Sequence, residues 1–325
     1  MYVGALTTLP GCYTMPHAVP PGAKNPTKSE TKPIGRDRRF ERLARLVDYE
    51  GIVKLRQAHV MVVGLGGVGS WCAEAIVRSG VGTVTLVDFD KVSINNFNRQ
   101  MPALETTVGV PKTKALLDRL KLINSHCEII IKEEQVSRFA IESIFDRPVD
   151  FVVDAIDQLG SKCALINYCV RQNIKLVSSA GAGGRLDPTQ IRIVDMSETR
   201  DDTLARMSRI YLRKRHMFPR KGQFYVPTVI SLEPIRLPVE PNFPPGSPDI
   251  TPPELAALDP VSKDKRKMIM GTAVFVTSCF GMTCASVAIR TILGEKILGI
   301  KNRPGSFRLP KEDPLPLPEY EGEPV

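Results

Sequence analysis

The stretch HVMVVGLGGVGS, residues 59–70, decides the fold. An apolar, mostly β-branched run ends at Val63 and leads directly into the pattern G-x-G-x-x-G, which a helical pattern follows. In such a turn Gly64 permits the sharp bend, Gly66 lets the backbone approach a phosphate, and Gly69 lets helix and strand pack closely. Free N–H groups at the start of the helix favour an anion there. The stretch therefore predicts a nucleotide-binding unit of strand, turn and helix.

Strands and helices alternate after this unit. Nearly continuous apolar runs predict strands at 83–88, 127–132, 151–154 and 175–179. Apolar residues at helical spacing predict helices at 112–124, 141–145 and 161–173. This alternation predicts an α/β fold with a doubly wound, mostly parallel sheet from about residue 55 to 195, extended by a C-terminal strand and helix region.

Two short helices are expected before the first strand, at 38–46 and 49–56. In the first of them Phe40, Leu43 and Leu46 fall on one face at helical spacing, with arginines around them. We expect that face to lie on the core.

The outer parts of the chain differ in composition from its centre. Residues 1–36 predict a disordered tail and residues 301–325 a Pro-rich tail, on either side of one domain at 37–300. Within that domain residues 196–270 are basic and Pro-rich, which suggests a substrate-side region. The proline-saturated part at 234–260 is expected to be an exposed loop without regular structure.

The segment 271–289 carries no charge and approaches the ~20 residues that a bilayer span needs. It contains several Ser and Thr residues, and its aromatic residues lie within it rather than at its ends. We expect a buried helix that packs closely through small residues, and no transmembrane span.

The composition indicates which partners and which compartment suit the protein. The formal net charge of +9 favours an anionic partner such as a nucleotide, RNA or an anionic membrane. The seven cysteines are irregularly spaced and include no C-x-x-C pair, so we expect buried, reduced thiols and no structural zinc site. This predicts a cytoplasmic protein without a secretory signal. Organelle association through the N-terminal tail or the charge-free helix stays an alternative.

Polar residues just beyond the second strand narrow the choice of ligand. Asp88 ends that strand, where a carboxylate can accept hydrogen bonds from ribose hydroxyls. A dinucleotide site has no need of the Arg99 guanidinium, whereas a triphosphate does, because Arg is a planar clamp for phosphate oxygens. Lys112 begins the next helix and can add a second cation. These residues favour a nucleoside triphosphate over a dinucleotide.

Two carboxylates, Asp154 and Asp157, lie at the end of the 151–154 strand. Ligands of such sheets bind at the carboxyl edge of the strands. Because Mg²⁺ takes oxygen ligands and keeps several waters, one of these carboxylates can hold it.

Four motifs together carry a family resemblance. They are GLGGVGS (64–70), LVDFDKVSINNFNRQ (86–100), VGVPKTKA (108–115) and DAIDQ (154–158). Together they resemble the adenylating enzymes of the ThiF and MoeB superfamily, which are related to the ubiquitin-activating enzyme. The segments 179–190 and 271–290 are similar to the tRNA threonylcarbamoyladenosine dehydratases within it (the TcdA group). The resemblance covers about residues 38–293.

The resemblance implies roles for the matching residues. The nucleotide site would comprise Gly64, Gly66, Gly67, Gly69, Asp88, Asp90, Asn96, Arg99 and Lys112. Asp88 would hold the ATP ribose, and Asn96, Arg99 and Lys112 would contact the phosphates. Asp157 would bind Mg²⁺, with Asp154 as a helper. In the superfamily an arginine before the first strand reaches the triphosphate of the neighbouring subunit, which implies a homodimer. Arg42 is the candidate here and would join Arg99, Lys112 and Asp157 in catalysis; Arg39 is the second choice.

The implied reaction is ATP-dependent dehydration of threonylcarbamoyladenosine in tRNA. The threonyl carboxylate becomes an acyl-adenylate, and loss of AMP allows ring closure. Some members carry a cysteine just before the last small-residue helix, but residues 265–270 contain none, and Cys279 and Cys284 are expected to be packing residues. We therefore expect the adenylate to cyclise directly, while a sulfur-carrier or redox partner stays an open question.

A basic cluster offers a tRNA surface. It contains Arg206, Arg209, Arg213, Lys214, Arg215, His216, Arg220 and Lys221, and Lys263, Lys265, Arg266 and Lys267 could extend it. No aromatic residues interleave with the cluster, so phosphate contacts are expected rather than base stacking. Three other functions stay open: adenylation of the C-terminus of a ubiquitin-like or sulfur-carrier protein, an NAD-dependent oxidoreductase, and a catalytically silent binding module.

Overall fold

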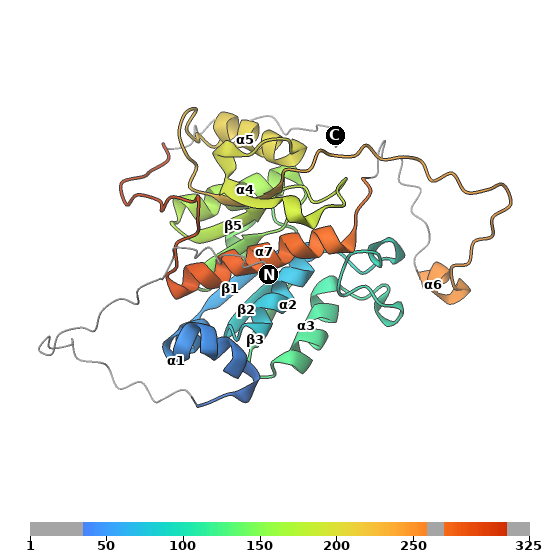
Figure 1. The fold of residues 1–325 in the computed structure, drawn as a ribbon, viewed down its shortest axis with the longest axis horizontal. Coiled ribbons are helices and arrows are strands. Elements are labelled where there is room, and N and C mark those ends of the chain that lie inside the picture. Colours follow the sequence, from blue (N-terminus) through green and yellow to red (C-terminus); the bar gives the residue numbers. More distant parts are fainter. Residues whose placement is uncertain (1–34, 259–269, 311–325) are drawn as a thin grey trace, which may run out of the picture. The chain divides into compact units, whose positions relative to one another are not determined.

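A seven-stranded sheet forms the centre of the computed structural model, which describes residues 35–258 and 270–310 (Figure 1). The strands are β1 (His59–Val63), β2 (Thr83–Val87), β3 (Glu128–Lys132), β4 (Phe151–Asp154), β5 (Lys175–Ser179), β6 (Ile191–Asp195) and β7 (Pro227–Ser231). Their order is β3-β2-β1-β4-β5-β7-β6, and every neighbouring pair is parallel except β6 with β7. The predicted doubly wound, mostly parallel α/β fold is confirmed. Strand order reverses between β1 and β4, where such folds bind ligands.

Helices cover both faces of the sheet (Figure 1). The α-helices are α1 (Glu41–Gln57), α2 (Gly69–Arg78), α3 (Lys112–Ile123), α4 (Leu159–Arg171), α5 (Thr203–Arg215), α6 (Pro253–Leu258) and α7 (Val274–Leu293). Short 3-10 helices lie at Arg38–Phe40, Ile94–Asn96, Glu105–Thr107, Ile141–Ile144, Pro188–Gln190 and Met196–Glu198. Because side chains alternate along a strand, Val60 and Val62 of β1 pack with α2 and α7, while Met61 and Val63 pack with α4.

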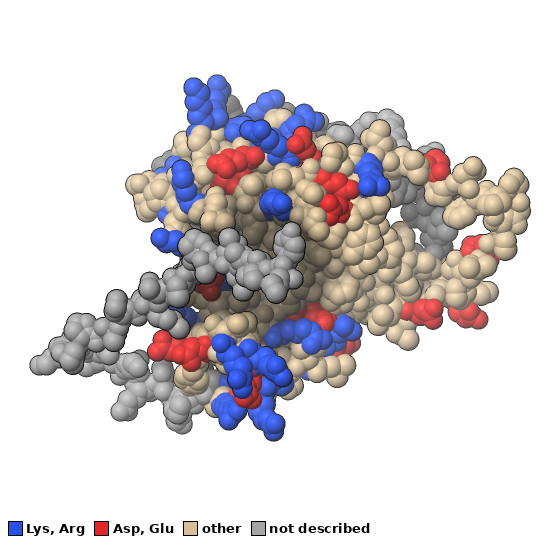
Figure 2. Space-filling view, in the orientation of Figure 1, with Lys and Arg blue, Asp and Glu red and all other residues tan. Residues whose placement is uncertain are grey.

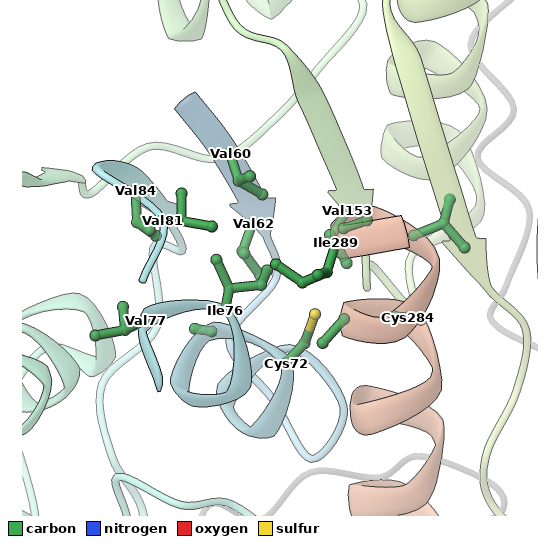
Figure 3. Close-up of a cluster of buried hydrophobic side chains, with 14 of the residues drawn as sticks. Val60, Val62, Cys72, Ile76, Val77, Val81, Val84, Val153, Cys284 and Ile289 are labelled. Carbon is green, nitrogen blue, oxygen red and sulfur yellow. The ribbon is translucent and has the colours of Figure 1, made fainter. Parts of the chain in front are cut away.

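Helices α2 and α7 pack against each other below β1 (Figure 3). Cys72 of α2 and Cys284 of α7 lie in the middle of this buried cluster. Gly281 makes the close approach possible, because a Cβ at that position would collide with the backbone of Val68. The predicted packing of a helix through small residues is confirmed. Among the described helices α7 alone is long and apolar enough to cross a membrane, but half of its apolar window is buried in the protein.

The helix before β1 is bent in the middle. Asp48 has φ 58° and ψ 178°, which breaks α1 into the two segments that the sequence predicts. Phe40 is buried and Leu43 packs on the core. The prediction for Leu46 is wrong: this side chain is 83% exposed, because it lies just before the bend, where the first segment leaves the core.

The proline-rich segment contains one element that the sequence did not predict. Residues 253–258 form the short helix α6, although the rest of 234–258 has no regular structure. Beyond α7 the chain packs against α4, where Arg303 donates to the Val170 carbonyl at 3.1 Å. The predictions for 1–34, 259–269 (with Lys263, Lys265, Arg266 and Lys267) and 311–325, and for Cys12, lie outside the described residues.

Candidate functional site

The glycine turn between β1 and α2 requires glycine at two positions. Gly64 has φ +88°, and a Cβ there would lie 2.7 Å from the Ala155 carbonyl oxygen of the neighbouring β4 end. A Cβ on Gly69 would collide with the Gly64 carbonyl oxygen. The first glycine therefore brings β1 and β4 together at the switch point, and the second packs the helix on the turn. Gly67 lies beneath the stem of Arg99, with 3.2 Å between its ideal Cβ position and the Arg99 Cγ.

Asp88 fixes the same turn from the end of β2. Its Oδ2 accepts a hydrogen bond from the Leu65 N–H at 2.6 Å, and its Oδ1 accepts one from the Asp90 N–H at 2.8 Å. Burial raises the pKa of this carboxyl group, and the nearby charge of Lys112 opposes that shift most strongly. Each carboxylate oxygen keeps a further lone pair for a ribose hydroxyl. Asp88 can thus order the turn and bind a ribose with one side chain.

Lys112 lies at the start of α3 and is almost wholly buried. Its Nζ donates to the Asp90 Oδ2 at 2.8 Å, and the Asp90 side chain is about half exposed. The ammonium has three donors, so it can hold Asp90 and still donate to a phosphate oxygen. The structure therefore brings Asp88, Asp90 and Lys112 together at the end of β2, as the sequence predicts.

The segment after β2 carries Asn96 and Arg99. Asn96 is buried and closes its own turn: its Oδ1 accepts from the Ser93 N–H at 3.1 Å and its Nδ2 donates to Asn95 at 2.6 Å. Its contact with a phosphate stays a prediction. The Arg99 Nη1 donates to the Asn95 carbonyl at 2.6 Å. Burial lowers the pKa of the Arg99 guanidinium, and the charge of Asp157 opposes that shift.

Gln100 adds a polar group that the sequence argument left without a role. It is buried, and its Oε1 has no hydrogen-bond partner within the described structure. Its Nε2 lies 3.9 Å from the ideal Cβ position of Gly66. A buried amide with one unpaired acceptor atom therefore lies next to the glycine turn.

The two carboxylates at the end of β4 have different environments. Asp154 is fully buried and forms an ion pair with Lys162 at 2.6 Å. It also accepts from the Ser178 hydroxyl at 2.6 Å and from the Ile156 N–H at 3.1 Å. Asp157 is exposed. Asp154 is therefore committed to holding the turn, which leaves Asp157 to face a ligand.

These carboxylates bear on the predicted magnesium site. No group of three or more His, Cys, Asp or Glu side chains that could hold a metal occurs among residues 35–258 and 270–310. One exposed carboxylate fits Mg²⁺, which is bound through one or two carboxylates together with substrate phosphates and waters. The assignment of Mg²⁺ to Asp157 stays a prediction.

Sequence reasoning missed Lys162, which lies in the first turn of α4 and is 1% exposed at its side chain. Its Nζ also donates to the Ser179 carbonyl at 2.9 Å and the Ser178 hydroxyl at 3.3 Å. The available signal was a lysine among small and apolar residues in a helix that follows a buried strand, because a buried lysine needs a partner.

Arg42 lies far from this site within its own chain. A Cβ on Gly51, in α1, would contact Leu293 at the end of α7, whereas Thr277 near the start of α7 lies at Gly67. Thr277 and Leu293 are 16 residues apart, or about 24 Å along a helix at 1.5 Å per residue. Arg42 is exposed and forms no ion pair in the described part of the chain. Arg39 is paired with Asp37 at 2.7 Å.

The chain is similar to known proteins of one family. The family model of the ThiF family matches residues 40–320. The tRNA threonylcarbamoyladenosine dehydratase of Haemophilus influenzae is 42% identical over 204 residues, 62% of this chain and 78% of that protein. The Escherichia coli protein of the same name is 35% identical over 263 residues, 79% of this chain and 94% of that protein.

A solved structure of the E. coli dehydratase, TcdA, in complex with ATP has a TM-score of 0.67 at 34% identity, and the match covers 79% of this chain and 94% of that chain. This chain belongs to the ThiF family. Within it, the chain belongs to the tRNA threonylcarbamoyladenosine dehydratase group.

The thiols of this ThiF-family chain are poorly placed for covalent chemistry. The six described cysteines are free, and all but Cys279 are buried. Burial raises the pKa of Cys163 and of Cys284 to about 12, and that of Cys127 to about 11. A thiolate is the reactive form, so these residues are inert. The interpretation of Cys284 as a packing residue is confirmed.

Helix α5 carries a row of arginines and lies on the side of the sheet opposite α7. Figure 2 shows Lys and Arg side chains gathered at the place of α5 in Figure 1. Arg206, Arg209 and Arg213 follow one another at helical spacing. Burial lowers the pKa of Arg209, and the charges of Arg213 and Arg206 lower it further. Arg213 lies over the Phe224 ring at 5.2 Å. This row of like charges is suited to an anionic partner.

Proposed function

We propose that this chain dehydrates threonylcarbamoyladenosine in tRNA at the expense of ATP. The observation that carries the proposal is the site at the β1–β4 switch point, where Asp88, Arg99, Lys112 and Asp157 surround a glycine turn. Support comes from relatives of nearly full length that are named for this reaction, one of them solved with ATP.

The reaction proceeds in two steps. A carboxylate oxygen of the threonyl group attacks the α-phosphorus of ATP, forming an acyl-adenylate and releasing pyrophosphate. A nucleophile within the same threonylcarbamoyl group then attacks the activated carbonyl carbon, loses a proton and expels AMP. The carboxylate oxygen that attacked the α-phosphorus leaves with AMP, so the nucleoside loses the elements of one water.

The side chains stabilise the charge that moves in the first step. Asp88 binds the ribose, while Arg99 and Lys112 hold the phosphates, and Asn96 supports the segment that carries Arg99. Preorganised cations of this kind are worth most where charge develops in the transition state. Mg²⁺, held by Asp157, would supply further neutralisation of the phosphates.

The active form would be a homodimer in which Arg42 reaches the triphosphate bound by the other subunit. Support comes from the position of Arg42, which is exposed and belongs to α1, the helix that packs at the end of α7 remote from the glycine turn. A contribution of Arg42 to the site of the other subunit would explain how a residue remote from its own site takes part in the reaction.

The tRNA would bind along α5. Arg206, Arg209 and Arg213 supply phosphate contacts, with Arg220 and Lys221 beyond the helix. Contacts of this kind position the substrate and weaken as salt rises. The free, buried thiols support a reducing compartment, for which we propose the cytoplasm.

The alternative is adenylation of the C-terminus of a ubiquitin-like or sulfur-carrier protein. Such enzymes would use a transfer thiol, and the buried cysteines described above disfavour it. In the proposed dehydration reaction, a sulfur-carrier or redox partner would act before or after the adenylation step and not within it.

The test supplies ATP, Mg²⁺ and tRNA bearing threonylcarbamoyladenosine, followed by nucleoside analysis. We expect a product lighter by one water. Asp157→Ala should abolish turnover without loss of the fold, and near-normal turnover of the folded variant would remove Asp157 from the mechanism. AMP release with a small protein bearing a Gly-Gly end, and no cyclised nucleoside, would favour the alternative.

A further inference from the structure

The loop that follows β5 is built around a buried arginine. Arg185 is 2% exposed, and its guanidinium donates to one carboxylate and four carbonyl groups. These acceptors are the Asp202 Oδ2 and the carbonyls of Gly181, Gly183, Asp201 and Glu233. A guanidinium has five N–H donors, and all five are used.

Asp202 joins this loop to α5. Besides its ion pair with Arg185 at 3.2 Å, its carboxylate accepts from the Ala205 N–H at 2.7 Å, which caps α5, and from the Gly181 N–H at 3.1 Å. The residue is buried. One ion pair therefore fixes how the arginine row of α5 lies against the loop.

The same loop reaches the nucleotide side through backbone contacts. The Gly184 N–H donates to the Gly271 carbonyl at 2.8 Å. The next carbonyl, that of Thr272, accepts from the Asn98 Nδ2 at 3.0 Å, and the Asn98 Oδ1 accepts from Arg99 at 2.9 Å. A continuous chain of contacts thus runs from α5 to Arg99.

The loop has little means of its own to keep this conformation. It contains three glycines, and Gly184 has φ +72°. Glycine leaves the backbone free to adopt many conformations. The Glu233 carboxylate, which accepts from the Leu186 and Asp187 N–H groups at 2.9 and 2.7 Å, and the Arg185 guanidinium supply the missing restraints. Fully satisfied buried networks of this kind specify one conformation.

We propose that Arg185 and Asp202 are a positioning pair that holds the tRNA-binding face of α5 in register with the phosphate-binding Arg99. The inference rests on the proposed function, because the reacting carboxylate is carried by the tRNA. A tRNA bound to α5 presents that carboxylate to the α-phosphorus only if the helix is correctly placed. A misplacement of about 1 Å can slow such a reaction about 100-fold.

The variant Arg185→Lys distinguishes the placement of α5 relative to Arg99 from the effect of the positive charge alone. The lysine keeps a cation beside Asp202, which favours folding, but it has three donors instead of five and no planar fork. We expect kcat at saturating ATP and tRNA to fall about 10- to 100-fold, while the KM values for ATP and tRNA change less than about threefold.

Asp202→Asn tests the other member of the pair. Asparagine still caps a helix, so α5 should form. We expect the same fall of kcat at nearly unchanged KM. Arg119→Lys is the matched control, because Arg119 joins α2 to α3 through Glu74 at 2.6 Å, away from the loop, and its kcat should equal that of the wild type.

A second measurement does not depend on turnover. Amide hydrogen exchange in the first turn of α5, at Ala205, should slow when ATP is added to the wild type and should respond less in Arg185→Lys. Two outcomes overturn the inference. One is a kcat that is unchanged in both variants, and the other is a fall in kcat that is matched by a proportional change in KM. A wild type that forms no cyclised nucleoside overturns the proposed function instead, and the exchange experiment then decides whether ATP and α5 are coupled.

Discussion

Removing Lys162 tests whether the buried ion pair beneath the site holds the β4 turn. Lys162 and Asp154 are 1% and 0% exposed at their side chains, with 2.6 Å between Nζ and Oδ2. Lys162→Met keeps the length of the side chain but leaves a buried carboxylate without its cation. Breaking a buried pair in this way costs about 3–5 kcal/mol in the free energy of unfolding.

The double variant Lys162→Met, Asp154→Asn removes both charges. An asparagine oxygen can still accept from the Ile156 N–H, so no charge is left unpaired. We expect it to recover at least about 2 kcal/mol relative to the single variant. Lys114→Met is the matched control, since it removes an exposed ion pair with Asp118 and should cost less than about 1 kcal/mol.

The assay is equilibrium unfolding in urea, followed by circular dichroism and by the fluorescence of Trp71, the single tryptophan of the chain. Trp71 lies in α2 and donates to the Arg99 carbonyl at 3.0 Å, so it reports on the glycine-turn side of the site. A Lys162→Met variant as stable as Lys114→Met would refute the reasoning, because a buried, unpaired carboxylate cannot be that inexpensive. Its turnover should also fall, because the turn that carries Asp157 loses its anchor.

Further predictions follow from the glycine turn, the subunit arrangement and the arginine row. Gly64→Ala should lower the free energy of unfolding in urea by at least about 1–3 kcal/mol and should weaken ATP binding. The reasons are the φ of +88° at this position and the Ala155 oxygen, which lies 2.7 Å from the new Cβ. A variant as stable as the wild type would contradict this prediction. Arg42→Ala and Asp157→Ala should each be inactive, but a re-equilibrated equal mixture should regain about a quarter of wild-type turnover, because half of the dimers are mixed and each holds one complete site; no recovery would mean that Arg42 does not act in trans. Arg206→Gln with Arg213→Gln should reduce the slope of log K for tRNA against log salt by about 1–2, and an unchanged slope would exclude α5 from the tRNA surface.

Local patterns made much of the fold and site predictable. The turn at Gly64, the strand ends at Asp88 and Asp157, and the start of α3 at Lys112 are each encoded within a few residues. Parallel strands end at one edge of a sheet, so these residues come together once the alternation is known.

Pairings between distant segments could not be predicted in this way. Lys162 meets Ser178, 16 residues on, and Arg185 meets Asp202, 17 residues on, only because buried charges find partners in the folded chain. The exposure of Leu46 was missed because α1 bends at Asp48. Helical spacing alone carries no information about such a bend.

The most direct test of the central claim follows the oxygen of the threonyl carboxylate. Threonylcarbamoyladenosine in tRNA is labelled with ¹⁸O at that carboxylate and converted with ATP and Mg²⁺ in a single turnover, and the AMP is analysed by mass spectrometry. In an acyl-adenylate, the carboxylate oxygen that attacked phosphorus stays bound to phosphorus when the ring closes. Each labelled oxygen that attacked phosphorus must therefore appear in AMP. Cyclised nucleoside formed together with unlabelled AMP would contradict the mechanism.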